Sequence, residues 1–482
     1  MLSVSETTPV TNREKHGVLQ RVITGVGWAF LGKVLGSASV LIVNAVLARH
    51  LSPEQMGAYF LLVSITAFGA IVARLGLAQL IVRVVAESMA TDLPGRAGGI
   101  VRNSFFAIAT AALILAGIYI AILNDWLAYS VFDSPLLGTV ANLVACWIAI
   151  LAIQTPVAEG FRGLHRIWLA VLFNGALASS ILAALLLLLS VAGRELNFEL
   201  AVFLTVLTAG VSLLLGALML RRHRSCLTGR GDASFREMVS LGWPLYVTAL
   251  SMQAIREIHL WIAGWMFLPG DVALFAAALK LVNLVNLPLM VMGMSIQPLI
   301  AELHVLGDRG PLQTALRGCA TVAGFPALAV LCLFILTGDH VMALAYGEKY
   351  KAGGYLLVLL SIGALSNVAT GVSMQVLAFT GHQRVLMAVT LISGIASTLL
   401  GLLGAYFFGL AGLAVGATVA RVVQQIATWW IVWRLTGYWS HATVRPAHLK
   451  VAFEYFLRAL SDRRRKRAHH GFSVSNELER DG

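Results

Sequence analysis

Five cationic side chains interrupt long apolar stretches of this 482-residue sequence, and they are its most unusual chemical feature. One acidic residue, Glu257, lies among them. A set of cations with so little acid is suited to binding an anion, because Arg presents a planar fork to phosphate and Lys presents a point charge. The five cations are Lys33, Arg74, Arg256, Lys280 and Arg421.

Polar side chains accompany these cations at helical spacing. Two stripes share a helical face, one made of Lys33, Ser37, Val40 and Asn44 and the other of Lys280, Asn283 and Asn286. A third group gathers Gln253, Arg256 and Glu257 within one apolar stretch. This pattern predicts that the polar faces look into a shared space.

The energetic cost of these charges indicates what that space contains. A charge at the middle of a bilayer costs roughly 2.5–3.5 kcal/mol, so five cations would not face lipid. Since we expect Glu257 to be the only deep acid, most of the cations have no partner, and we predict a water-filled, positively charged cavity. The alternative is that Arg256 or Lys280 pairs with Glu257 and merely joins two helices. Glu257 is also the one candidate for coupling to a proton or sodium ion.

The elements that position these residues are predicted to be transmembrane helices. The chain is 58% hydrophobic and only 12% charged, with a mean hydropathy of +0.82, whereas soluble domains carry about 25% charged residues. Because about 20 apolar residues cross a bilayer, we predict an all-α integral membrane protein with twelve spans. These spans are 22–48, 57–85, 101–123, 136–158, 167–192, 199–220, 239–266, 272–300, 313–336, 353–379, 385–408 and 410–433.

The distribution of Lys and Arg orients the spans. Most of the 35 basic residues fall in the tails and in the connections on one side of the predicted membrane. The connections on the other side hold only Arg49, Arg194, Lys349 and Lys351. Cytoplasmic loops carry the excess of positive charge, so both termini are predicted to be cytoplasmic.

The chain resembles itself across two halves. Gly27-Trp28 and Leu51-Ser52-Pro53 in the first half correspond to Gly242-Trp243 and Leu268-Pro269-Gly270 in the second. Such repeats imply a pseudo-two-fold axis with a site between the halves. We predict an N-terminal tail (1–21), an N-lobe (22–220), a basic linker (221–238), a C-lobe (239–433) and a basic tail (434–482). Apolar spacing near 449–460 predicts an amphipathic helix on an anionic leaflet, with a disordered tail as the alternative.

Missing motifs narrow the function. The sequence contains no Walker A, HExxH or GxSxG pattern, and its four cysteines have no metal-binding spacing. We therefore expect no catalytic residue, no metal and no cofactor. Basic residues beside apolar spans favour contact with membrane lipids over nucleic acid. His259 is expected to be a satisfied core residue.

Two segments carry a family resemblance. Gly27-Trp28, Ala48-Arg49 and the run from Leu51 to Tyr59 (LSPEQMGAY) resemble the polysaccharide transporter branch of the multidrug/oligosaccharidyl-lipid/polysaccharide exporter superfamily. The run from Ile296 to Leu303 (IQPLIAEL), with Gly307-Asp308, resembles the end of span eight in that branch. The resemblance covers roughly residues 20–435.

The resemblance implies two six-helix lobes in a V around a central cavity, in a bacterial inner membrane. It implies a flippase that moves a polyprenyl-diphosphate-linked oligosaccharide to the periplasmic leaflet, for O-antigen, capsule or exopolysaccharide synthesis. The five cations would then hold the diphosphate, with Asn283 and Gln253 on sugar, and a polysaccharide polymerase and glycosyltransferases would be partners. The alternatives are a drug-cation antiporter of the same superfamily, which predicts acids in the cavity, and a membrane polysaccharide polymerase or ligase, which predicts a long catalytic loop.

Overall fold

The protein is helical wherever its structure is described. The computed structural model describes residues 12–78, 80, 81, 85, 94–164, 166–222, 235–306 and 309–443, and these ranges contain helices and turns but no strand. The apolar composition explains this result, because a helix satisfies every backbone hydrogen bond within the membrane. The predicted all-α fold is confirmed.

The first half of the chain forms six crossings. Its helices are α1 (Asn12–His50), α2 (Pro53–Arg74), α4 (Pro94–Ile118) with the π-helical turns η1 (Tyr119–Leu123) and η2 (Trp126–Val131), α5 (Pro135–Thr139), α6 (Ala141–Gly163), α7 (Ile167–Val171), η3 (Leu172–Ala176), α8 (Leu177–Val191) and α9 (Phe198–Arg222). The start of α2 is encoded locally. Ser52 and Gln55 form a reciprocal capping box, and Pro53 occupies the first turn.

The second half repeats this layout. Its helices are α10 (Phe235–Met266), α11 (Pro269–Leu306), α12 (Arg309–Tyr346), η5 (Glu348–Gly353), α13 (Gly354–Thr370), α14 (Ser373–Phe379) and α15 (Gln383–Thr436). Gly371, at a φ of 72°, divides the predicted span 353–379 into α13 and α14. Gly409, at a φ of 62°, reverses the chain inside α15, so α15 makes the last two crossings.

The predicted number of crossings is consistent with these helices. Ten helices of the described chain are long and apolar enough to cross a membrane, and the reversal at Gly409 makes the last of them count twice. The remaining crossing is α10, which runs beside α2. Trp261 Nε1 donates to Ser64 Oγ (2.8 Å), and the Tyr246 hydroxyl donates to the Val72 carbonyl (3.2 Å). Ser64 and Val72 are eight positions apart, about 12 Å along the helix, so α10 packs beside α2 over at least that depth.

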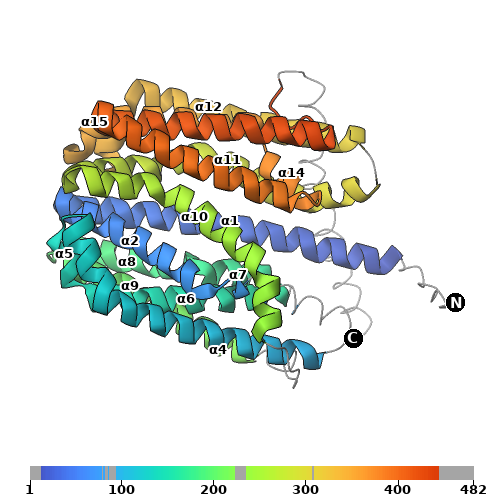
Figure 1. Cartoon of the computed structure of the whole chain (residues 1–482), viewed down its shortest axis with the longest axis horizontal. Helices are drawn as coiled ribbons and strands as arrows, with labels where there is room; N and C mark the ends of the chain where they lie inside the picture. The colour runs from blue at the N-terminus through green and yellow to red at the C-terminus, as the bar shows by residue number, and fades with distance from the viewer. Residues whose placement is uncertain are drawn as a thin grey trace, which may run out of the picture.

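The helices gather into two bundles (Figure 1). We call α1–α9 the N-terminal bundle and α10–α15 the C-terminal bundle; α4, α6 and α9 lie low in the figure, α11, α12 and α15 lie high, and α1 and α10 pass between them. The bundles contact each other through α1, α2 and α4 on one side and α10, α11 and α12 on the other. We call the end of the molecule where α1 begins and α15 ends the terminal end. We call the far end, where α1 ends and α2 begins, the opposite end.

At the opposite end the bundles are tightly closed. A Cβ on Gly57 of α2 would overlap the backbone carbonyl oxygen of Pro269 at the start of α11, and a Cβ on Gly270 would lie 3.9 Å from Pro53 Cβ. Arg49 Nη2 donates to the Leu344 carbonyl across the same interface (2.6 Å). The two turns that the sequence identified as repeat equivalents therefore meet each other.

Several predictions concern parts that the structure describes only in part or not at all. The N-terminal tail, the linker 221–238 and the tail 434–482 extend into residues outside the described ranges, and the proposed amphipathic helix lies wholly outside them. The lobe boundaries stay predictions. The predicted span 57–85 is interrupted: α2 ends at Arg74, because Leu75 adopts a left-handed conformation (φ 51°), and residues 77, 78, 80, 81 and 85 are helical again.

Candidate binding cavity

A cavity of about 200 Å³ lies inside the N-terminal bundle. Its walls come from α1, α2, α6, α9 and the junction of η3 with α8, and Lys280 of the C-terminal bundle also lines it. The lining residues are Val40, Val43, Asn44, Tyr59, Phe60, Val63, Trp147, Leu151, Gln154, Gly175, Ala178, Ser179, Leu182, Thr205, Thr208, Ala209 and Lys280. Amides, hydroxyls and one cation provide its polar groups, and no acid is among them.

Asn44 is the polar lining residue whose amide lacks a hydrogen-bond acceptor. It is only 4% exposed, and its Nδ2 is buried without a hydrogen-bond partner in the structure. Other polar groups in the wall have partners: the Tyr59 and Thr205 hydroxyls bond each other (3.3 Å), and Gln154 Nε2 donates to Ser212 Oγ (3.2 Å). A buried orphan donor costs about 1–3 kcal/mol, so Asn44 calls for an acceptor from within the cavity.

A break in the fifth crossing opens onto the same cavity. In η3, Asn174 has φ −85° and ψ 36° and Gly175 has φ 107°, outside helical values. Irregular backbone at membrane depth is tolerated where it lines a cavity or is buried in protein, and Gly175 does line this one. The sequence signal was an Asn-Gly pair in an apolar span, which our prediction of a continuous helix at 167–192 overlooked.

Lys280 links the two bundles. Its Nζ lies 5.9 Å from the centre of the Phe60 ring on α2, and it interacts electrostatically with Glu257 on α10. With a rise of about 1.5 Å per residue, Lys280 lies about 16 Å from the start of α11, near the middle of a bilayer core about 30 Å thick. Of the predicted site residues, Lys280 is the one that lines this cavity.

Arg256 and Arg421 form a second cationic site, within the C-terminal bundle. They are close enough to interact electrostatically, and Arg421 Cβ lies against Gly363 of α13. Arg256 is exposed, and both lie about 15–18 Å from the opposite end by the helix rise. Glu257 accepts a hydrogen bond from Gln253 Nε2 (2.8 Å). The predicted cluster of Gln253, Arg256 and Glu257 thus gains Arg421, but these residues do not line the N-terminal cavity.

The remaining predicted residues lie elsewhere. Lys33 is exposed on α1, about 25 Å from the opposite end. Asn283 is exposed, and its amide donates to the Leu279 carbonyl (3.4 Å) of its own helix. The predicted stripe through Asn286 is corrected, because Asn286 Oδ1 accepts from Asn367 Nδ2 of α13 (2.9 Å). Asn286 comes six positions after Lys280, which turns it about 120° away around the helix.

Arg74 has an acidic neighbour that the sequence interpretation missed. Glu159, 8% exposed on α6, pairs with Arg162 (2.9 Å) and interacts electrostatically with Arg74. Glu257 is therefore not the only acid buried among the helices, a correction to the charge count. The predicted span 136–158 stopped one residue before Glu159. His259 does satisfy its predicted core role: it is 8% exposed, and its Nε2 hydrogen-bonds Ser397 Oγ (3.1 Å).

This fold is shared by known membrane transporters. The chain aligns with the inward-facing structure of a multidrug resistance MATE family transporter of the MOP superfamily at 16% identity, covering 84% of this chain and 97% of that one, with a TM-score of 0.67. A Vibrio cholerae MATE transporter aligns at 14% identity over 87% and 97%, with a TM-score of 0.62. A MOP superfamily transporter from Pyrococcus furiosus aligns at 16% over 86% and 94%, with a TM-score of 0.60.

The sequence comparison identifies the family. Residues 22–304 match the family model described as polysaccharide biosynthesis protein. Because this match covers more than half of the chain, the protein belongs to that family. Curated proteins yield no sequence match. The chain is therefore a multi-pass membrane protein of the polysaccharide biosynthesis family with the fold of MOP superfamily transporters.

Proposed function

We propose that this protein is a flippase that moves a polyprenyl-diphosphate-linked oligosaccharide from the cytoplasmic to the periplasmic leaflet of a bacterial inner membrane. Both termini lie in the cytoplasm in this proposal, as the Lys and Arg distribution favours. The family supports a polysaccharide substrate, and the fold supports transport by alternating exposure of a site between two bundles. The protein acts as a transporter and performs no covalent chemistry.

The observation that carries this proposal is the composition of the N-terminal cavity. Its polar groups are amides and hydroxyls, as a sugar requires, and its one charge is the cation Lys280. Drug-sized ligands occupy roughly 300–1,000 Å³, so a cavity of about 200 Å³ suits a single sugar ring better. An acid that would attract a cationic drug is absent from this lining.

The diphosphate would lie beside the sugar, between the bundles. Lys280 is placed to contact it, with Arg256 and Arg421 at a similar depth in the C-terminal bundle and exposed Lys33 closer to the terminal end. Gln253 and Asn283 would contact further sugars, and Glu257 is the candidate for ion coupling. Arg74, beside Glu159, is the member whose surroundings favour a structural role.

Lys280 also provides a way for substrate to shift the equilibrium between closed and open arrangements of the two bundles. It belongs to the C-terminal bundle yet lines a cavity of the N-terminal bundle. A ligand held there contacts both bundles only while they are closed at this level. Differential binding of this kind is what allows a ligand to shift a conformational equilibrium.

Reconstitution tests the function directly. In proteoliposomes we expect translocation of a lipid-linked oligosaccharide, measured as protection of its sugars from an external glycosidase. Polyprenyl diphosphate without sugar should compete weakly. Uptake of a cationic dye with no movement of the oligosaccharide would instead identify an antiporter, and a polymerised glycan product would identify a polymerase; either result refutes the proposal.

Replacing Asn44 with Leu is expected to separate stability from transport. The change removes a buried amide without a partner, so the melting temperature should rise, by an amount equivalent to about 1 kcal/mol. Translocation of the oligosaccharide should fall, because the cavity loses a donor to sugar. Asn142→Leu, at an exposed amide at the start of α6, is the matched control. Unchanged translocation by Asn44→Leu would exclude the cavity as the sugar site.

A further inference from the structure

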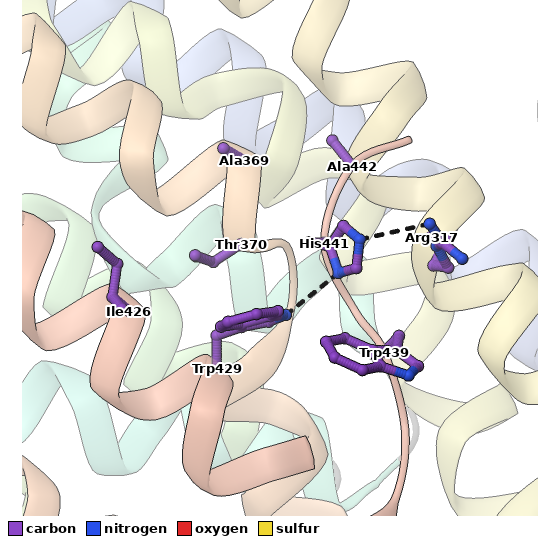
Figure 2. Close-up of a pocket in the computed structure, with 8 residues that line it drawn as sticks. All are labelled: Arg317, Ala369, Thr370, Ile426, Trp429, Trp439, His441 and Ala442. Atoms are coloured by element: carbon purple, nitrogen blue, oxygen red, sulfur yellow. Dashed lines mark hydrogen bonds between the residues drawn. The ribbon is translucent and has the colours of Figure 1, made fainter. Parts of the chain in front are cut away.

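A second cavity lies at the terminal end of the C-terminal bundle, apart from the proposed transport site. Its volume is about 660 Å³, and its walls come from α12, α13, α15 and the segment after α15. Figure 2 shows the lining residues: Arg317, Ala369, Thr370, Ile426, Trp429, Trp439, His441 and Ala442. None of these residues belongs to the site that the proposed function uses.

An ordered segment, residues 437–443, holds this cavity in shape; we call it the strap. The Ala442 amide donates to the Ala369 carbonyl (2.8 Å), Ser440 Oγ donates to the Thr370 carbonyl (2.9 Å), and the Thr443 amide donates to Thr321 Oγ1 (2.9 Å). These bonds tie the strap to α12 and to the end of α13. The positions of Trp439 and His441 are therefore fixed by the fold.

His441 lies between two groups that can only donate hydrogen bonds (Figure 2). Trp429 Nε1 is 3.3 Å from His441 Nδ1, and Arg317 Nη2 is 3.3 Å from His441 Nε2. Indole and guanidinium have no acceptor, and a neutral imidazole has one. If Nδ1 accepts from Trp429, Nε2–H faces the guanidinium; if Nε2 accepts from Arg317, Nδ1–H faces the indole. One donor is left without an acceptor in either tautomer.

No acidic side chain among the lining residues can serve as the missing acceptor. Arg317 Nε is also buried without a partner in the structure. Burial, with a smaller contribution from the charge of Arg317, lowers the pKa of His441 from 6.5. Since the pKa lies below 6.5, the ring is mainly neutral at pH 7, and no acid among the described lining residues compensates the charge of Arg317.

We propose that this cavity binds a phosphate group, with Arg317 and Trp429 as hydrogen-bond donors to its oxygens. A phosphate supplies several strong acceptors where the protein has too few, and it neutralises the guanidinium. The indole rings of Trp429 and Trp439, 5.4 Å apart, supply an apolar wall beside the charge. Trp and basic residues at the ends of membrane helices are typical of contact with lipid headgroups, although an inorganic phosphate ion presents the same oxygens.

The test separates these two sources of phosphate. The full-length protein in a neutral detergent is titrated with inorganic phosphate against chloride at matched ionic strength, and its melting temperature is recorded. In parallel, native mass spectrometry counts lipids retained from nanodiscs of phosphatidylcholine with and without phosphatidylglycerol. A melting shift with phosphate indicates a free anion; retained phosphatidylglycerol alone indicates a lipid headgroup. Either result supports the proposal, and absence of both overturns it.

Variants then assign the binding to this cavity. Arg317→Gln and Trp429→Phe are each expected to weaken binding about tenfold, as loss of a charge-assisted or desolvated hydrogen bond predicts. The control is Arg434→Gln. Arg434 lies at the same end of α15 but stacks on Trp430 and Trp433 and lines no part of the cavity. Trp429→Phe keeps the ring, so it stays informative if Arg317→Gln does not fold. Binding unaffected by both variants, or lost equally in Arg434→Gln, overturns the assignment.

Discussion

Replacing Lys280 with Ala is expected to reduce translocation of the lipid-linked oligosaccharide about thirtyfold or more, with little change in membrane insertion. Lys280 is the charge that lines the N-terminal cavity and also reaches across to the other bundle. Truncating one member of a buried charged pair costs about 2–5 kcal/mol, which corresponds to this loss if Lys280 contacts the diphosphate in the transition state. The initial rate in proteoliposomes, divided by the amount of inserted protein, measures it.

Two comparisons make this result specific. Lys280→Arg keeps the charge and should retain more translocation than Lys280→Ala. Lys351→Ala removes a lysine from an exposed surface pair with Glu348 and should have no effect. A normal rate for Lys280→Ala would show that the substrate anion does not use this lysine. Loss in both Lys280 variants with dye transport preserved would favour a different substrate.

Most of the helix positions could be predicted from the sequence because their signals are local. Hydropathy locates apolar stretches, and Ser52-Pro53 and Gly409 mark where helices begin or break. The reversal at Gly409 is a good example. Gly404 and Gly412 approach so closely that a Cβ on either would overlap the other's carbonyl oxygen, and the predicted spans 385–408 and 410–433 leave Gly409 between them. The break at Gly371 was missed, because 353–379 was predicted as one span.

The grouping of charged residues could not be predicted in the same way, because it depends on how helices rotate and pair. Arg74 and Glu159 are 85 positions apart, and nothing local indicates that α2 and α6 bring them together. Helical spacing placed Val40 and Asn44 on one face, and both do line the cavity. It also placed Asn286 on the face of Lys280. Each step of three residues falls about 60° short of a full turn, so after two such steps Asn286 faces Asn367 instead.

The strap was beyond sequence reasoning for a related reason. Trp439 and His441 follow the last span without any periodic pattern, and their partners Gln313, Arg317 and Trp429 are distributed over α12 and α15. Arg317 lies inside the predicted span 313–336, and its position along the chain does not single it out. The surroundings of Arg317 contain too few hydrogen-bond acceptors. This shortage is seen only when α12, α15 and the strap bring Arg317, Trp429 and His441 together.

Replacing Gly57 with Ala is expected to open the opposite end of the molecule. An added Cβ would overlap the Pro269 carbonyl oxygen and lie 3.2 Å from its carbon, and backbone atoms at the start of α11 cannot move aside independently. In an ordinary helix interior the same change stabilises by about 1 kcal/mol. Here the overlap should cost about 1–3 kcal/mol of the closed arrangement, and the open state of the proposed alternating-access mechanism would relieve it.

The measurement uses a reporter cysteine at Ala48, which is 2% exposed at the opposite end, in a background with the four native cysteines replaced by Ala. Labelling by a membrane-impermeant maleimide should rise about tenfold in Gly57→Ala, as a shift of about 1.4 kcal/mol predicts. Gly117→Ala is the control, because a Cβ there meets nothing within 4 Å. Equal labelling in both variants would mean that the contact between the two repeat-equivalent turns does not hold the opposite end closed. Faster labelling with slower translocation is the result that the alternating mechanism requires, since closure at this end is one of its two states.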